Sequence, residues 1–474
     1  MTETLTPAVR PATAAAPAGL TTARGAALYI GALLGPGLLL LPGLAAAAAG
    51  PASVLAWAGL LVLSGLFAVV FGALGRGFPS AGGVIGYVRA GLGARASAVA
   101  GWLFLAGVVA GAPVVCLIGA GYVTELTGGG TLARALIAAL LLAVVLALAA
   151  GGLRTSAAAQ LLLVALLIVV VTVAVAGSAG QARAANWTPF APHGWQAVGH
   201  AASVLMLSFV GWEAAAPLTT RFANPARQLP RVIGIALAVT SVLYLGLAVA
   251  TIGVLGMGGA GGAGGAAGAP LAALLHDAAG TAGTAAAAVA AVVLTLGAVN
   301  AYVSGAAEMT RELTRRGPAG PAAGPARPAP RFLAAVALSG LGVIALYGAG
   351  LATPAALVAL PTTLFLVVYL GCMTSAARVL RGPARLAAVP AAVIVALVLG
   401  YCGWALLAPA VVAVAVLAPR PGHAGARRAG PVTPAARRDQ PGLAPAPGFA
   451  GPAPAANRAD ERIVAATWNV RPPA

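Results

Sequence analysis

Apolar runs long enough to cross a lipid bilayer recur along most of this chain. A helix of about 20 residues spans the ~30 Å hydrocarbon core of a membrane. Of the 474 residues, 60% are hydrophobic and only 8% are charged, which excludes a soluble domain that hides its apolar residues in one core. A chain in lipid must satisfy its backbone polar groups internally, and helices do this within each segment. The sequence therefore predicts an all-α polytopic membrane protein.

The apolar runs predict about 12 transmembrane helices within residues 25–418. Residues 1–24 would precede them as a cytoplasmic segment. Residues 419–474 are rich in Pro, Ala and Arg and lack apolar periodicity, so they predict a disordered basic cytoplasmic tail. The predicted spans lie near 26–48, 53–75, 98–122, 132–151, 155–177, 197–219, 232–256, 281–308, 332–351, 354–376, 385–401 and 403–418.

Arginine is distributed unequally between the two sides of this predicted topology. The formal net charge is +18, and all 27 basic residues are arginine. With the N-terminus in the cytoplasm, only Arg134 and Arg183 fall on the outer side. Cytoplasmic loops of membrane proteins carry such an excess of basic residues. We therefore expect a multi-pass protein of the cell membrane with both termini cytoplasmic, in contact with lipid and not with nucleic acid.

Two of the predicted spans are interrupted near their middle. The first break is Gly35-Pro36-Gly37, and the second is residues 208–211. A helix broken at membrane depth is tolerated where it lines a cavity, and paired breaks in two halves of a chain indicate a transporter's substrate site. The spans divide into five, five and two, with a break opening each set of five, which predicts two inverted five-helix repeats. A simple proline kink in a packed helix is the alternative explanation for the first break taken alone.

The first break has the composition of an anion site. Gly35 frees the backbone from helical angles, and Pro36 suits the first position of a restarting helix. The N–H groups of Gly37, Leu38 and Leu39 would then point into the break at the positive end of a helix dipole. This arrangement predicts binding of a substrate carboxylate.

The second break is predicted to present backbone carbonyls to a substrate ammonium group. Its residues are Ser208, Phe209, Val210 and Gly211, and Glu213 follows two positions later. A carboxylate inside an apolar span is costly, which favours a functional role, here as a proton-titrating group. The alternative is a structural carboxylate satisfied by neighbouring helices. Together the two breaks predict a receptor for a zwitterion.

Other polar residues give weaker indications. Asn300 and Ser304 share one side of the eighth span and could line a cavity, although helix–helix hydrogen bonds are equally plausible. The sequence contains no nucleophile–base, paired-carboxylate or metal-ligand pattern, so we expect no enzyme activity, no cofactor and no metal.

Four motifs occur in order along the chain. They are the Gly-x-Gly break at 35–37, Pro79-Ser80-Ala81-Gly82-Gly83 followed by Gly101-Trp102, Phe209-Val210-Gly211 with Glu213, and Asn224-Pro225 through Pro230-Arg231. These motifs resemble the amino acid–polyamine–organocation superfamily, and most closely its bacterial methionine and branched-chain amino acid exporters. The resemblance covers about residues 24–418.

The resemblance implies a twelve-helix transporter that works by alternating access and proton coupling. By position, residues 35–37 would bind the substrate carboxylate, residues 208–211 the amine, and Glu213 would couple to protons. Many members have a hydroxyl residue between the two glycines, whereas Pro36 has neither a hydroxyl nor an N–H group. Carboxylate binding at the first break would then depend on backbone N–H groups.

The resemblance also indicates the substrate class. Leu207 stands where some cationic amino acid exchangers carry an aromatic lid, and it would line the cavity. This favours an apolar, uncharged side chain on the substrate. Together with the similarity to the exporters, the resemblance implies a proton-coupled exporter of methionine or branched-chain amino acids. The alternatives are an amino acid importer of the same superfamily and a membrane receptor or scaffold that does not transport.

Overall fold

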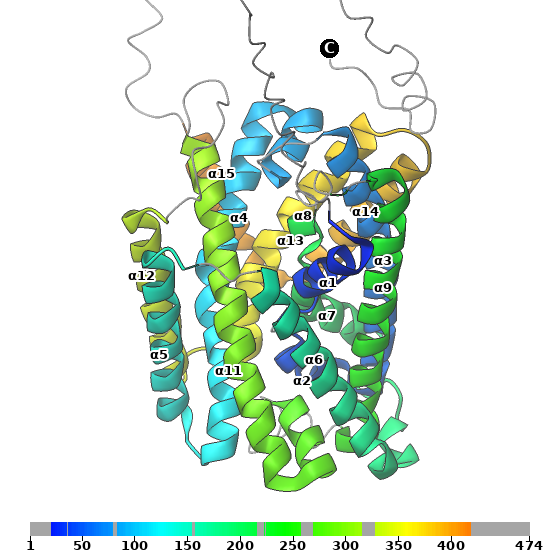
Figure 1. Cartoon of the computed structure of the whole chain (residues 1–474), viewed down its shortest axis with the longest axis vertical. Helices are drawn as coiled ribbons and strands as arrows, with labels where there is room; N and C mark the ends of the chain where they lie inside the picture. Colours follow the sequence, from blue (N-terminus) through cyan, green and yellow to red (C-terminus); the bar gives the residue numbers. More distant parts are fainter. Residues whose placement is uncertain are drawn as a thin grey trace, which may run out of the picture.

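The described part of the chain is a single bundle of helices. The structure, a computed structural model, describes residues 20–35, 37–78, 83–153, 157–215, 222, 224–256, 269–314 and 328–418. Within these ranges all regular elements are helical, apart from an isolated β-bridge between Leu20 and Phe222. Most helices run along the long axis of the molecule and pack side by side (Figure 1). The predicted all-α fold is confirmed, whereas most of the terminal segments 1–24 and 419–474 lies outside the described residues.

Over its described residues, each predicted span coincides with one helix or with two or three consecutive helical segments. Nine helical segments of the described residues are long and apolar enough to cross a membrane, while Gln196–Phe209 and Gly403–Leu417 are shorter. This confirms a polytopic membrane protein; the inverted-repeat layout stays a prediction. The α-helices are α1 (Thr22–Leu33), α2 (Gly37–Ala49), α3 (Ser53–Gly77), α4 (Val84–Thr127), α5 (Thr131–Ala150), α6 (Ala157–Ser178), α7 (Gln196–Leu205), α8 (Trp212–Ala215), α9 (Pro225–Ala250), α11 (Pro270–Thr314), α12 (Pro330–Gly348), α13 (Pro354–Val379), α14 (Gly382–Gly400) and α15 (Leu407–Leu417).

Local capping residues explain where several helices begin. The Asn224 side chain accepts a hydrogen bond from the backbone N–H of Arg227 at 3.3 Å, and proline follows at the first position of α9. Thr353 caps α13 in the same way, with a 3.3 Å bond from Ala356 N–H. A side-chain acceptor satisfies one of the free N–H groups of the first turn, and proline there has no N–H to satisfy.

Two helices begin more than ten residues before the apolar spans that predict them. α4 begins at Val84 rather than near 98, and its early part ends at Gly93, whose φ of 84° is accessible to glycine. α11 begins at Pro270 rather than near 281 and contains a kink at Gly280, with φ 61°. Charged residues interrupt the apolar pattern in both early parts, so an apolar window does not detect them.

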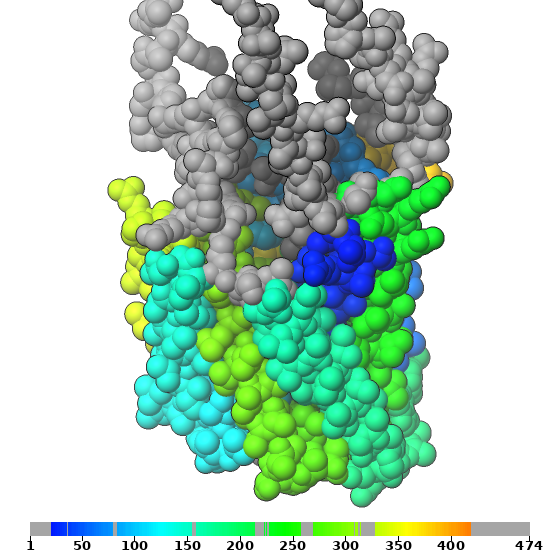
Figure 2. Space-filling view, viewed as in Figure 1, coloured from blue at the N-terminus to red at the C-terminus, as the bar shows by residue number. Residues whose placement is uncertain are grey.

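The outer surface of the bundle is apolar. Figure 2 shows one flank, with side chains of α5, α6, α9 and α11 forming a continuous wall. Such a surface would aggregate in water, and it matches the hydrocarbon of a bilayer. Exposed large apolar residues recur four or seven positions apart on these helices, among them Leu132, Leu136 and Leu140 on α5, Leu162, Val169 and Val173 on α6, and Ile235, Val242 and Val249 on α9.

The broken segments lie in the centre of the bundle. α4 packs against α11 and α13, and α1 and α2 pack against α9, α6 and α7. Leu38 to Leu41 at the start of α2 are almost completely buried, as are Phe209 and Trp212 of the second interrupted segment. The fold thus places both predicted breaks where they contact protein rather than lipid.

Candidate functional site

The first break is present between α1 and α2. α1 ends at Leu33, and the N–H of Gly35 donates to the Leu33 carbonyl at 2.9 Å in a tight turn. α2 begins at Gly37. Pro36, predicted to start this second half of the helix, lies outside the described residues.

The first turn of α2 contains N–H groups for which the described residues offer no acceptor. Leu38 N–H donates to the Gly35 carbonyl at 3.1 Å and is therefore paired. The N–H groups of Gly37 and Leu39 have no hydrogen-bond partner within the described residues. A helix N-terminus with free N–H groups attracts an anion, so this end of α2 has the donors that a carboxylate needs.

The second break is also present, and it needs a glycine. After α7 the chain forms a 3-10 turn over Met206–Phe209, becomes extended at Val210 and restarts as α8 at Trp212. Gly211 between them has a φ of 145°, a region that side chains other than glycine rarely adopt. A Cβ atom at this position would lie 2.2 Å from the Ala32 carbonyl oxygen. The second break is therefore in direct backbone contact with the end of α1.

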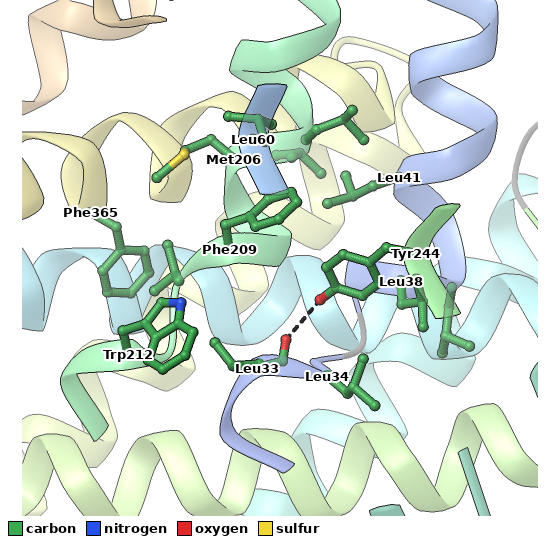
Figure 3. Close-up of a cluster of buried hydrophobic side chains, with 14 of the residues drawn as sticks. Leu33, Leu34, Leu38, Leu41, Leu60, Met206, Phe209, Trp212, Tyr244 and Phe365 are labelled. Atoms are coloured by element: carbon green, nitrogen blue, oxygen red, sulfur yellow. Dashed lines mark hydrogen bonds between the residues drawn. The ribbon is translucent and has the colours of Figure 1, made fainter. Parts of the chain in front are cut away.

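Tyr244 of α9 connects the two breaks. Its hydroxyl lies 2.8 Å from the Leu33 carbonyl (Figure 3), and it also lies 2.7 Å from the Ser208 carbonyl. A tyrosine hydroxyl has one proton, so it can donate fully to only one of these carbonyls at a time. The Ser208 carbonyl, one of those predicted to bind an ammonium group, thus faces Tyr244. The Phe209 ring packs against Tyr244, with ring centroids 5.3 Å apart, and is buried.

A cavity of about 60 Å³ lies beside both breaks. Among the predicted site residues, Gly35 and Gly37 of the first break and Leu207 and Val210 of the second line it; Leu38, Ser208, Phe209 and Gly211 do not. The opposite wall consists of Gly107 and Gly111 of α4, Tyr302 of α11 and Phe365 of α13. The cavity is largely apolar, and the glycines of α4 leave room that larger side chains would fill.

The two polar residues predicted to line a cavity on the eighth span lie elsewhere. Asn300 is buried, and its amide donates to the Leu153 carbonyl at 3.1 Å, in the segment that follows the end of α5. Ser304 is half-buried, and it does not line the cavity beside the breaks. Tyr302, between them on α11, lines the cavity, as do Ala298 and Val299 of the same helix.

Glu213 is buried in the first turn of α8, with 6% of its surface exposed. Its carboxylate accepts a hydrogen bond from the Gly211 N–H at 2.9 Å and another from the Tyr369 hydroxyl of α13. The Gly211 N–H is also 2.9 Å from the Tyr369 oxygen. Phe67 and Phe71 of α3 enclose the Tyr369 ring, with centroids 4.8 and 5.3 Å away. The carboxylate therefore has two neutral donors in an apolar environment, and the second break supplies one of them.

Sequence reasoning missed Tyr244 and Tyr369, which hold the two breaks and the carboxylate. Both are among the largest fully buried side chains of the described residues. A buried tyrosine generally needs a partner for its hydroxyl, so a tyrosine in the middle of an apolar span was the available signal. It gives no indication of which carbonyl or carboxylate the hydroxyl meets.

Comparison with known proteins identifies the family. A model of the family described as "Amino acid permease" matches residues 20–319, a range that contains both breaks and Glu213. The chain belongs to the amino acid permease family. Membership of this family makes the chain an amino acid transporter. Separately, the described residues contain no group of three His, Cys, Asp or Glu side chains that could hold a metal ion.

Curated relatives agree with this family assignment. The permease is 32% identical over 374 residues to the uncharacterized amino acid permease YecA of Bacillus subtilis, which covers 77% of this chain and 87% of the relative. It is 33% identical over 211 residues to the L-methionine/branched-chain amino acid exporter YjeH of Escherichia coli, covering 44% of this chain and 50% of the relative. A shorter match, 35% over 69 residues, joins it to the branched-chain amino acid permease BcaP of Bacillus subtilis.

Proposed function

We propose that this permease is a secondary active transporter that exports neutral amino acids, methionine and the branched-chain amino acids in particular, in exchange for protons. The observation that carries the proposal is the contact between the two breaks beside an apolar cavity, with a buried carboxylate on the second break. The substrate would move across the membrane without chemical change, so the protein would need no cofactor.

The site has separate regions for the parts of a neutral amino acid. The free N–H groups of Gly37 and Leu39 suit the carboxylate, because they lie at the positive end of α2. Carbonyls of the second break suit the ammonium group. The apolar cavity toward Gly107 and Gly111 suits an aliphatic or thioether side chain, and the walls named above place no charged group there. A charged side chain would lose its hydration without a partner.

Glu213 is suited to couple the site to protons. An ionised carboxylate only accepts hydrogen bonds, whereas a protonated one also donates, so its bonds with Gly211 and Tyr369 must change on titration. A proton that binds one conformation of the transporter better than the other shifts the balance between them. Glu213 would thereby bias alternating access from the edge of the second break.

The relatives support the substrate class and, more weakly, the direction. The names of YjeH and BcaP both include branched-chain amino acids, and YjeH is named as an exporter. Import would use the same contacts with the gradients reversed. The proposed arrangement is a twelve-helix protein of the cell membrane with two inverted five-helix repeats and both termini in the cytoplasm, from the arginine distribution.

Transport in proteoliposomes tests the proposal. The purified protein would be reconstituted, and efflux and uptake of labelled methionine, leucine, isoleucine, valine, alanine, lysine and glutamate measured with and without a pH gradient. We expect flux of methionine and the branched-chain amino acids that a pH gradient accelerates, and little flux of lysine or glutamate. Absence of flux for every neutral amino acid would refute the proposal. A flux with the same rate in the presence and absence of a pH gradient would refute proton coupling.

A further inference from the structure

We infer that the Ser208 hydroxyl is the side-chain donor for the substrate carboxylate, so that a residue of the second break completes the anion site of the first. This inference rests on the proposed function, because it assigns a ligand to the same site. It differs from the role predicted for residue 208 by sequence, which was to offer its carbonyl to the ammonium group.

The Ser208 hydroxyl is buried without a well-formed hydrogen bond. Its residue is 2% exposed, and its Oγ atom makes no hydrogen bond of normal distance and angle, although the Tyr244 hydroxyl lies close enough to interact with this side chain. Other buried serines of the bundle do not share this feature: the hydroxyls of Ser97, Ser178 and Ser375 donate to carbonyls at 2.8, 2.6 and 2.5 Å. Leaving a buried hydroxyl unpaired costs free energy, so an unpaired one beside a candidate site indicates a missing ligand.

The hydroxyl lies against the start of α2. Its Oγ atom is 3.2 Å from the position that a Cβ atom on Gly37 would occupy. Gly37 is the first residue of a 13-residue helix, and the N–H groups of Gly37 and Leu39 have no partner among the described residues. A hydroxyl donor and two N–H donors therefore gather at one helix N-terminus. A carboxylate has two oxygens and about four acceptor positions, enough for all three.

The backbone of Ser208 is engaged elsewhere, which leaves the side chain for a ligand. Its carbonyl faces the Tyr244 hydroxyl at 2.7 Å. Pro36, between the two glycines of the first break, has no hydroxyl and no N–H to offer. The donor that the first break lacks is thus supplied from the second, across the contact between Gly37 and Ser208.

A carboxylate bound this way would hold both breaks at once. Hydrogen bonds to a charged group are stronger than those between neutral groups, so a free carboxylate gains more from these donors than an amide would. The site should therefore select amino acids over their amides.

Binding measurements on Ser208 variants test the inference. Purified protein would be titrated with L-leucine and L-leucinamide, and the midpoint of thermal unfolding followed without and with L-leucine. The variants are Ser208→Ala, Ser208→Thr, which keeps a hydroxyl, and Ser208→Val, which has the shape of threonine without it. Thr251→Val is the matched control, because Thr251 is also a buried hydroxyl without a partner but lies in a turn that packs near the far end of α2.

We expect Ser208→Ala to weaken L-leucine binding roughly ten- to hundredfold, the range for a hydrogen bond to a charged group. Ser208→Thr should bind L-leucine more tightly than Ser208→Val. Ser208→Ala should weaken L-leucinamide binding less than L-leucine binding. Without ligand, Ser208→Ala should unfold no earlier than the wild type, since it loses no hydrogen bond. Thr251→Val should bind L-leucine like the wild type.

Three outcomes would overturn the inference. Wild-type L-leucine affinity in Ser208→Ala shows that the hydroxyl does not bind the carboxylate. Equal affinities of the threonine and valine variants, or a lowered unfolding midpoint of ligand-free Ser208→Ala, show that the residue acts through packing. If the wild-type protein binds no neutral amino acid, the proposed function itself fails, and this result is distinct from a silent Ser208 variant.

Discussion

Replacing Gly211 with alanine tests the central geometric claim, that the two breaks touch. Gly211 has a φ of 145°, and a Cβ atom there would stand 2.2 Å from the Ala32 carbonyl oxygen. Carbon and oxygen atoms that are not bonded to each other rarely approach closer than about 3.3 Å. The backbone of α1 or of the second break must therefore shift by about 1 Å to admit one methyl group. Backbone atoms cannot rotate away as the end of a side chain can.

The cost follows from two separate effects. A non-glycine residue held in a sparsely populated backbone region costs about 1–3 kcal/mol. Forcing extra atoms into a packed interior costs about 1–3 kcal/mol more. Gly211→Ala should therefore lower the free energy of unfolding by about 2–6 kcal/mol, which is large against the usual net stability of about 5–15 kcal/mol. Because the shift moves the end of α1, binding of the amino acid should weaken as well.

Thermal unfolding of the purified protein, with binding of L-leucine measured in parallel, provides the assay. Gly234→Ala is the matched control: Gly234 is an exposed glycine of α9, and a Cβ atom there meets nothing within 4 Å. We expect the midpoint to fall by several degrees in Gly211→Ala and not in Gly234→Ala. An unchanged midpoint in Gly211→Ala would show that the end of α1 and the second break are not in contact, which removes the basis for a shared site.

Three further changes test other parts of the site. Glu213→Gln keeps the size of the side chain but cannot titrate, so we expect pH-driven flux to be lost while exchange of one amino acid for another continues; pH-driven flux at the wild-type rate would exclude Glu213 as the coupling group. Tyr244→Phe leaves a buried carbonyl without its donor and should lower the free energy of unfolding by about 1–3 kcal/mol, with the partly exposed Tyr401→Phe as the control for a chemical denaturation series. Gly111→Val fills the cavity next to Pro361 and should weaken leucine binding more than alanine binding in a competition assay; equal losses would place the substrate side chain elsewhere.

The sequence predicted the features of the site that depend on neighbouring residues. Both helix breaks could be predicted from the sequence, because glycine and proline change the allowed backbone angles at their own positions. Gly35, Pro36 and Gly211 are such residues in otherwise apolar spans. The buried carboxylate at 213 was readable for a similar reason: an ionisable residue stands out against the apolar residues around it. The lengths of the apolar runs predicted the positions of the spans. They placed the start of α4 at 98 rather than at Val84, because the helical turns before Gly93 contain a charged residue and so do not form a continuous apolar run.

The contacts between distant residues could not be predicted. Tyr369 meets Glu213 across 156 positions of sequence, and Tyr244 meets Leu33 across 211. In chains so rich in Ala, Leu and Val, many helix faces are nearly equivalent, so the apolar pattern does not specify which helices pack together. For the same reason the sequence did not predict which way the Phe209 side chain points. Its ring packs in the core against Trp57 and Tyr244, although its neighbour Val210 lines the cavity.

The positions of Gly211 and Tyr244 suggest how proton binding at Glu213 would reach the substrate. The Gly211 N–H donates to the Glu213 carboxylate, and the same residue contacts the carbonyl of Ala32 near the end of α1. The next carbonyl along, that of Leu33, shares the Tyr244 hydroxyl with Ser208. Protonation of Glu213 that weakens its hydrogen bond with the Gly211 N–H would thus act on both breaks through adjacent contacts. The Tyr244 hydroxyl would then change which of the two carbonyls, Leu33 or Ser208, accepts its hydrogen bond. Coupling needs an element with two arrangements that both ligands bias, and a single proton placed between two carbonyls has two arrangements. On this reasoning Tyr244→Phe should impair proton coupling in addition to stability, although Tyr244 touches neither the carboxylate nor the cavity.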